Sequence, residues 1–240
     1  MGSPFLVERL PRFRGPGTAT APAGDAHTGK SFDFFEYDKL EPGRQIHAEV
    51  MQDIPGTSVK RRAHVVGHVV SVSPDSSGDV RLEFRFDAIN MRNHRIPIET
   101  DLRALASFQE VQQAQVPAEQ ASRGITPEVA NTTQIGGDQV YRGGGPVAVG
   151  NEVVGKPTPW GVVAVPRTQR GMPCRGAIGG DNSQQAFWLF STDACGVYGL
   201  GKVRIEHAGR TQPTGTMVLV GSKGRLNVGS GAGLLLRVIE

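Results

Sequence analysis

Cys174 and Cys195 are the two cysteines of this chain, and their neighbouring residues decide among several possible roles. A nucleophile elbow needs glycine two residues before and after the reactive residue, but Asp193 and Val197 occupy those positions around Cys195. A zinc site usually draws its ligands from paired motifs such as CxxC or HxxxH, and each of these cysteines stands alone. The pattern favours a disulfide. Two unpaired packing cysteines, or a catalytic or metal-binding role, are the alternatives.

A disulfide between Cys174 and Cys195 would close a loop of about 20 residues and stabilise the fold by roughly 3 kcal/mol. Flanking glycines, including Gly176 and Gly196, allow the backbone the close approach that the bond requires. Structural disulfides persist in oxidising compartments. The pair therefore predicts an extracellular or periplasmic protein.

Asp181, Asp193 and His207 are the other residues that could carry chemistry, if the fold gathered them in one cleft. With the 136–210 loops they could form a secreted hydrolase or a carbohydrate-binding module, and Cys195 could join Asp193 and His207 in a catalytic set. Asp181 follows two glycines, however, as turn residues do. We therefore expect no catalytic residue and no enzyme, and keep the hydrolase or carbohydrate-binding module as the alternative.

Two further patterns resemble ligand sites only superficially. His64 and His68 have the spacing by which a helix brings two imidazoles to one metal. The segment HVVGHV is valine-rich and favours a strand, in which residues four apart lie about 13 Å from each other. The glycine clusters at 142–146, 221–224 and 229–233 match neither the P-loop nor the dinucleotide motif. We expect no metal and no cofactor.

Composition is that of a soluble globular protein with little helix. The 240 residues are 38% hydrophobic and 20% charged, and 32 glycines and 16 prolines interrupt helical segments. The net charge is +3, and no run of five basic residues occurs, so we expect no nucleic-acid partner. No segment approaches the roughly 18 apolar residues of a membrane-spanning helix.

Alternation of apolar and polar side chains predicts strands. Residues 80–87 alternate without exception, residues 45–51 do so nearly as well, and a turn-rich segment, PDSSGD, closes a hairpin over about 64–87. After a strand at Ile96 and Ile98, the composition predicts the one helix. Its expected N-cap is Thr100, and its apolar face comprises Leu102, Leu105, Phe108 and Val111.

These elements predict an all-β fold of two packed β-sandwich or barrel-like units with one short helix at the join. The expected divisions are a flexible arm (1–34), an N-terminal β domain (35–115), a linker (116–135) and a glycine-rich C-terminal β domain (136–240). The arm carries Phe5, Leu6, Val7 and Leu10, which could add as a strand to a neighbouring subunit.

Residues 39–107, from LEPGRQIHAEVM through HVVGHVV to VRLEFRFDAIN, resemble the β domain of TrbI-like scaffold proteins of type IV secretion systems. The later segments FWLFSTDACGVYG and HAGRT are similar to the C-terminal part of uncharacterised secreted envelope β proteins of bacteria that share that domain. The resemblance implies an exported β protein with a structural or binding role, and no activity.

Together these observations predict a non-enzymatic extracellular or cell-envelope structural protein that self-assembles through its N-terminal arm. Its expected partners are further copies of itself or other envelope proteins. A soluble periplasmic module of a larger transport apparatus is a third possibility, and it would have a different protein as its partner.

Overall fold

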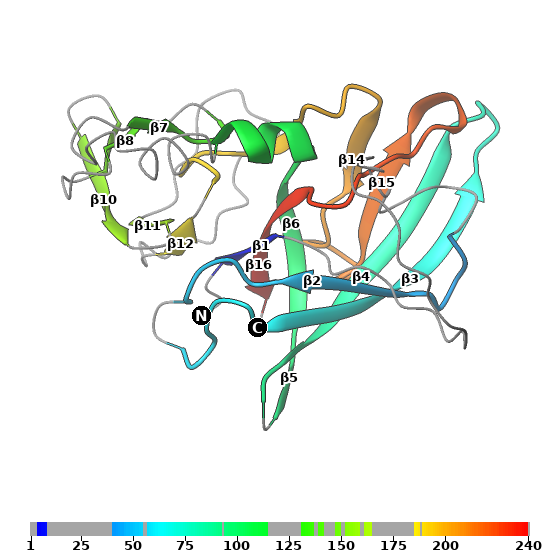
Figure 1. Ribbon diagram of the computed structural model, residues 1–240. Coiled ribbons are helices and arrows are strands. Elements are labelled where there is room, and N and C mark those ends of the chain that lie inside the picture. The colour runs from blue at the N-terminus through cyan, green and yellow to red at the C-terminus, as the bar shows by residue number, and fades with distance from the viewer. Residues whose placement is uncertain are drawn as a thin grey trace, which may run out of the picture.

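The protein has an all-β fold, as predicted, in which strands from both halves of the chain share two sheets and a core (Figure 1). The computed structural model describes residues 4–8, 40–54, 57–92, 94–114, 131–136, 139–141, 147–149, 152–158, 161–164, 185–187 and 189–239. Within these ranges, no helix has the length and apolar character needed to cross a membrane.

The largest sheet has six strands, and all of its pairs are antiparallel. Its order is β14-β15-β4-β3-β2, with β5 beside β4. The predicted hairpin over 64–87 is confirmed as β3 and β4. The strands are β2 (Gln45–Glu49), β3 (His64–Pro74), β4 (Val80–Asn90), β5 (Arg95–Pro97), β14 (Val203–His207) and β15 (Met217–Gly221).

The second sheet has the order β1-β16-β6-β13 and joins the two ends of the described chain. β16 lies between β1 and β6 and is antiparallel to both, whereas β13 pairs with β6 in parallel. Its strands are β1 (Pro4–Glu8), β6 (Glu99–Ala106), β13 (Gly196–Tyr198) and β16 (Gly233–Ile239).

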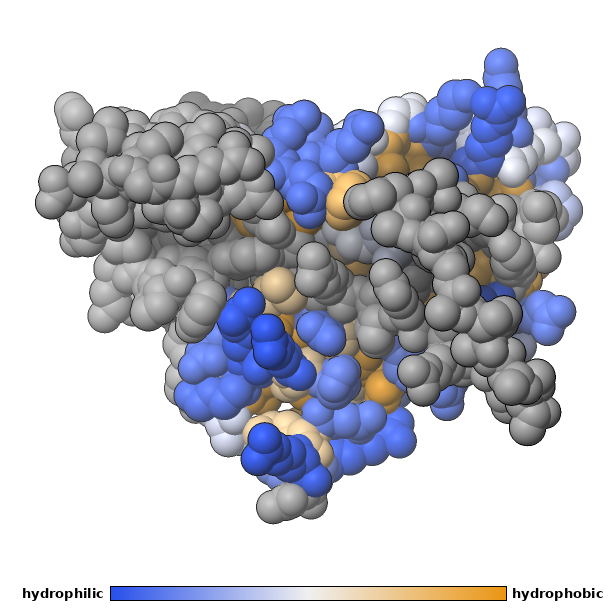
Figure 2. Space-filling model, in the orientation of Figure 1, coloured by the Kyte–Doolittle hydropathy of each residue, from blue (hydrophilic) through white to orange (hydrophobic). Residues whose placement is uncertain are grey.

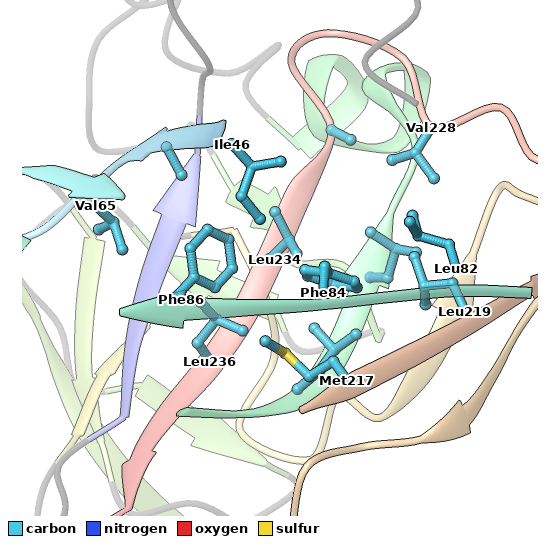
Figure 3. Packing of buried hydrophobic residues seen from close by; sticks show 14 of the residues in the cluster. Ile46, Val65, Leu82, Phe84, Phe86, Met217, Leu219, Val228, Leu234 and Leu236 are labelled. Carbon is cyan, nitrogen blue, oxygen red and sulfur yellow. The ribbon is translucent and has the colours of Figure 1, made fainter. Parts of the chain in front are cut away.

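The larger core lies between these two sheets. Phe84 and Phe86 of β4 are fully buried, with their rings edge to face and 6.0 Å between centroids. Figure 3 shows them in the same cluster as Leu234 and Leu236 of β16. The alternation of apolar and polar residues in β4 thus forms a half-buried strand, as predicted, whose apolar side chains fill the space between the two sheets.

A smaller core covers the other face of the second sheet. Leu235 of β16 packs there with Val111 of the helix at 108–114 and with Phe190. The central strands β6 and β16 are consequently buried on both faces along most of their length.

Two small sheets form the lobe at the left of Figure 1. One has the order β12-β11-β10-β9, and the other pairs β7 with β8. A 3-10 turn, η3 (Ser222–Gly224), precedes β16. The strands of the lobe are β7 (Asn131–Thr133), β8 (Gln139–Tyr141), β9 (Val147–Val149), β10 (Glu152–Thr158), β11 (Gly161–Ala164) and β12 (Gln185–Phe187).

The expected division into 35–115 and 136–240 does not separate the two large sheets. β15 pairs with β4, and β16 pairs with β6, so strands of the C-terminal range complete sheets begun by the N-terminal range. Pairing between strands so distant in sequence leaves no local pattern from which it could be predicted.

The expectation that the helix begins after Thr100 is wrong. Residues 99–106 form β6, and the helix begins at 108, with Ser107 as its cap. The Glu110 backbone N–H donates to Ser107 Oγ over 3.3 Å, which satisfies one of the amides at the start of the helix. Because β6 is buried on both faces, its sequence lacks the alternation that identifies a half-buried strand.

The N-terminal segment is a strand for part of its length, which corrects the expectation of a flexible arm at these residues. Pro4–Glu8 form β1 and pair with β16 of the same chain, with Phe5 opposite Leu236, Leu6 opposite Leu235 and Val7 opposite Leu234. Leu10 and the rest of 9–39 lie outside the described residues. The prediction that this segment adds to another subunit is not tested by this pairing.

At Gly67 the backbone of β4 leaves no room for a side chain on β3, and replacement of Gly67 by alanine should destabilise the fold strongly. A Cβ at this position would lie 2.0 Å from the Arg85 carbonyl oxygen, so the two strands would have to move apart. We expect Gly67→Ala to lower the free energy of unfolding by about 3 kcal/mol, measured by urea denaturation. Gly201→Ala is the control, because nothing lies within 4 Å of its Cβ position. Equal stability of the two variants would contradict this packing.

Candidate functional site

Two charged residues lie inside the second sheet, where apolar residues are expected. Asp101 is 1% exposed and Arg103 is 5% exposed, both on β6. The register with β16 passes from Ala104 opposite Leu235 to Leu102 opposite Leu236, so Arg103 is the extra residue of a β-bulge. A bulge changes the direction in which a side chain points. Here the bulged residue is Arg103, whose guanidinium is buried within the fold.

Asp101 is held by two arginines from different parts of the chain. One carboxylate oxygen accepts from Nε and Nη2 of Arg237 on β16, over 2.8 Å and 2.5 Å. The other accepts from Nε of Arg210 over 3.5 Å, and Nη2 of Arg210 also donates to the Leu102 carbonyl. Charge-assisted pairs of this kind are strong when the carboxylate is shielded from water. Asp101 therefore ties β6 to β16 and to the loop after β14.

Arg103 reaches across to the segment before β13. Its Nη2 donates to the Thr192 carbonyl over 2.8 Å, and Ser191 Oγ in the same segment donates to Asp193 Oδ1 over 2.8 Å. Burial lowers the pKa of Arg103 to about 10, with Arg210 acting in the same direction, while Asp193 opposes the shift. The carboxylate thus offsets part of the cost of burying the guanidinium.

Cys195 follows the segment 191–193, to which Arg103 donates its hydrogen bond. It is 7% exposed, and its backbone N–H donates to the Tyr198 hydroxyl over 3.0 Å. Burial raises the pKa of Tyr198, whose ring stands edge to face with Phe190 at 6.5 Å. The Cys195 thiol is not free, and Cys174 lies outside the described residues, so the disulfide between them stays a prediction.

Of the residues considered for a catalytic cleft, His207 hydrogen-bonds to its own loop. His207 Nδ1 lies 2.7 Å from the Thr216 carbonyl oxygen, and its Nε2 lies 3.1 Å from Thr211 Oγ1, both in the loop after β14. No hydrogen bond of His207 within the described chain goes to Asp193 or Cys195. Asp181 lies outside the described residues.

The histidines of the large sheet lie on its outer face, and the strand predicted at His64 and His68 is confirmed. His68 Nδ1 lies 2.7 Å from Asp87 Oδ2, whereas His64 is exposed. Burial, and then the nearby His64, lower the pKa of His47 on the neighbouring strand. Across the described residues, no group of three or more His, Cys, Asp or Glu side chains could hold a metal ion.

Four charged residues join separate segments of the chain through hydrogen bonds. Asp101, Arg103, Arg210 and Arg237 connect β6, β16, the loop after β14 and the segment at 191–193. Asp101 and Arg103 are not among the site residues that the sequence predicts, because the pattern of TDLRAL predicts a helix, whose charged residues would lie on an exposed face. In a strand that is buried on both faces, the same two residues are unusual.

Comparison of the chain with protein-family models, with curated proteins and with solved structures found no match. The resemblance to TrbI-like β domains therefore remains a prediction from the sequence.

Replacing Asp101 by asparagine should destabilise the protein, because Arg210 and Arg237 would lose the negative charge that compensates them. The Asp101 side chain is 2% exposed, and those of the arginines are about a fifth exposed. We expect Asp101→Asn to lower the free energy of unfolding by about 3 kcal/mol, measured by urea denaturation.

Asp53→Asn is the matched control for this change. Asp53 pairs with Lys60 over 3.2 Å at the surface, where both side chains are more than half exposed. Exposed pairs contribute roughly 0–1 kcal/mol, so this variant should unfold close to the parent protein. A similar loss in both variants would show that the Asp101 pairs contribute no more than a surface pair.

The predicted disulfide has a direct test in the intact mass. Protein isolated without reductant should be lighter by two hydrogen atoms than the reduced protein, and digestion should release one peptide pair linking Cys174 to Cys195. Cys174→Ser and Cys195→Ser should each lower the free energy of unfolding by about 3 kcal/mol, and the double variant by no more. Additive losses, or a fully reduced mass, would contradict the pairing.

Proposed function

We propose that this protein is a non-enzymatic structural component outside the cytosol, in the cell envelope or beyond it, and that it assembles by exchange of its N-terminal strand. In the exchanged form, β1 of one copy pairs with β16 of another. The observation that carries the proposal is the position of β1, a five-residue strand at the edge of the second sheet.

The place of β1 in the sheet supports exchange between molecules. Among the described strands, β1 pairs with β16 alone, and residues 9–39 separate it from the next described residue. That length of chain could span at most about 100 Å if fully extended, which exceeds the width of a small domain. The main-chain hydrogen bonds of β1 are the same whether β16 belongs to its own chain or to a neighbour.

The consequences of exchange depend on its symmetry. If two copies exchange strands reciprocally, the product is a closed dimer. If each copy passes its strand to the next, the product is an open chain of subunits. Intramolecular pairing has the advantage of high local concentration, so exchange is favoured when the protein itself is concentrated.

The proposed location follows from the cysteines, because a disulfide between Cys174 and Cys195 would need an oxidising compartment. The hydrolase or carbohydrate-binding alternative has less support. His207 hydrogen-bonds within the loop that follows β14, and no hydrogen bond joins it to Asp193 within the described chain.

Removing the donor strand should abolish assembly. We expect the mass of the full chain, measured by light scattering, to rise above that of one subunit as its concentration rises. A variant lacking residues 1–30 should stay at the mass of one subunit, because it has no β1 to donate. The same single-subunit mass before and after the deletion would overturn the assembly proposal.

Two double variants test whether assembly requires β1 to pair as a strand, or only requires residues 1–30 to be present. Leu6→Pro with Val7→Pro removes two adjacent N–H groups, and one of any two adjacent groups in an edge strand points to its partner. This variant should behave like the deletion. Leu6→Ile with Val7→Ile keeps strand-forming residues and every N–H group, so it should assemble like the parent.

A further inference from the structure

One end of the six-stranded sheet collects basic residues from two strands and two loops. His64 at the start of β3 lies opposite Asn90 at the end of β4, and Asn90 lies opposite Arg95 at the start of β5. Neighbouring strands are about 4.8 Å apart, so the backbones at His64 and Arg95 are about 10 Å apart. The turns that carry Arg62 and Arg92 extend beyond this row.

We call this surface the basic end. Its side chains are exposed, and they come from the loop before β3 and from the β4–β5 hairpin. It consists of Lys60, Arg62, His64, Arg92, His94 and Arg95.

The positive charge of the basic end is only partly neutralised by neighbouring residues. Asp53 pairs with Lys60 over 3.2 Å and accepts the Arg61 backbone N–H. Among the described residues, Arg62, Arg92 and Arg95 form no ion pair. Three guanidinium groups are therefore available to an external anion.

The opposite end of the same sheet differs in this respect. Arg204 Nη1 lies 3.0 Å from Asp79 Oδ2, and the Lys223 backbone N–H donates to the other oxygen of Asp79. Asp75 adds a second carboxylate in the same turn, where it accepts the backbone N–H of Asp79. Ten residues of β4 separate the two ends, or about 33 Å. Exposed basic side chains also occur near that end, at Lys202, Lys223 and Arg225, where the carboxylates of Asp75 and Asp79 accompany them.

The shape of the basic end is convex. Figure 1 shows the β4–β5 hairpin projecting from the body of the protein at the bottom of the view. Figure 2 shows hydrophilic residues on this projection beside a smaller hydrophobic patch, and more hydrophilic residues on the body above it. A projecting surface that carries several cationic side chains can meet a broad anionic surface with all of them at once.

We propose that the basic end docks the protein on a membrane surface that carries anionic lipid headgroups. The contact is electrostatic, between the guanidinium groups of Arg62, Arg92 and Arg95 and lipid phosphates. This proposal goes beyond strand-exchange assembly and shares with the proposed function only its envelope location. Docking would place the hairpin and the loop before β3 against the headgroups and leave the opposite end of the sheet facing away.

Vesicle sedimentation with the full chain tests the proposal. The vesicles contain phosphatidylcholine alone or with about one-third phosphatidylglycerol, in about 0.1 M salt, where screening acts over about 10 Å. We expect the protein to sediment with the anionic vesicles and not with the neutral ones. Arg62→Gln with Arg92→Gln and Arg95→Gln should weaken binding about a hundredfold, since each basic residue contributes about fivefold.

A second triple variant controls for net charge. Lys202→Gln with Lys223→Gln and Arg225→Gln removes the same number of charges from exposed positions near the opposite end of the sheet. It should bind anionic vesicles within a few-fold of the parent protein. Circular dichroism and urea denaturation of both triple variants establish that each remains folded.

Several results would overturn membrane docking. These are equal losses in the two triple variants, equal sedimentation with neutral vesicles, or no sedimentation with anionic vesicles. Tighter binding of the parent to duplex DNA than to vesicles, lost in the basic-end variant, would assign the surface to nucleic acid instead. The light-scattering test of assembly uses β1 variants alone, so failure of one proposal can be told from failure of the other.

Discussion

Burial of β6 and β16 on both faces is the constraint on which the rest of the structure depends. One face of these strands closes the core against β4, and the other packs on the helix at 108–114 and on Phe190. Strands in this position must be apolar on both sides, or must have partners for every polar group. The three leucines at 234–236 meet the first condition. The second condition is met in part, because Asp101 and Arg103 hydrogen-bond to Arg237 and Thr192, whereas Thr100 Oγ1 of β6 has no hydrogen-bond partner among the described residues.

The same constraint explains which parts of the fold could be predicted from sequence. β3 and β4 have one face in the core and one toward solvent, so alternation located them to within a few residues. β6 has no solvent face, and its leucines at 102 and 105 match helical spacing, so the sequence predicts a helix there. The motif SFQE at 107–110 was the available signal, since a serine followed three residues later by glutamate marks a helix start.

Neither the pairing of distant strands nor the buried charges could be predicted from the sequence, and the two failures are related. No local pattern indicates that β15 pairs with β4 or that β1 pairs with β16. The buried charges depend on those pairings, because Arg237 reaches Asp101 only when β16 lies beside β6. His207 and Asp193 are near each other in the sequence but hydrogen-bond to different residues. Asp193 accepts from Ser191 in the segment before β13, whereas His207, at the end of β14, lies against Thr216.

The order of the strands along the chain sets when the fold can form. β16 is the last described strand, yet it is central to the second sheet and contributes to both cores. Contacts between residues so far apart in sequence slow folding, because long loops must close before the contacts form. A nascent chain that has not yet produced β16 would leave the phenylalanines of β4 without their covering leucines. Such a chain would stay open until synthesis had passed this strand, and during that interval it would be a substrate for chaperones and proteases.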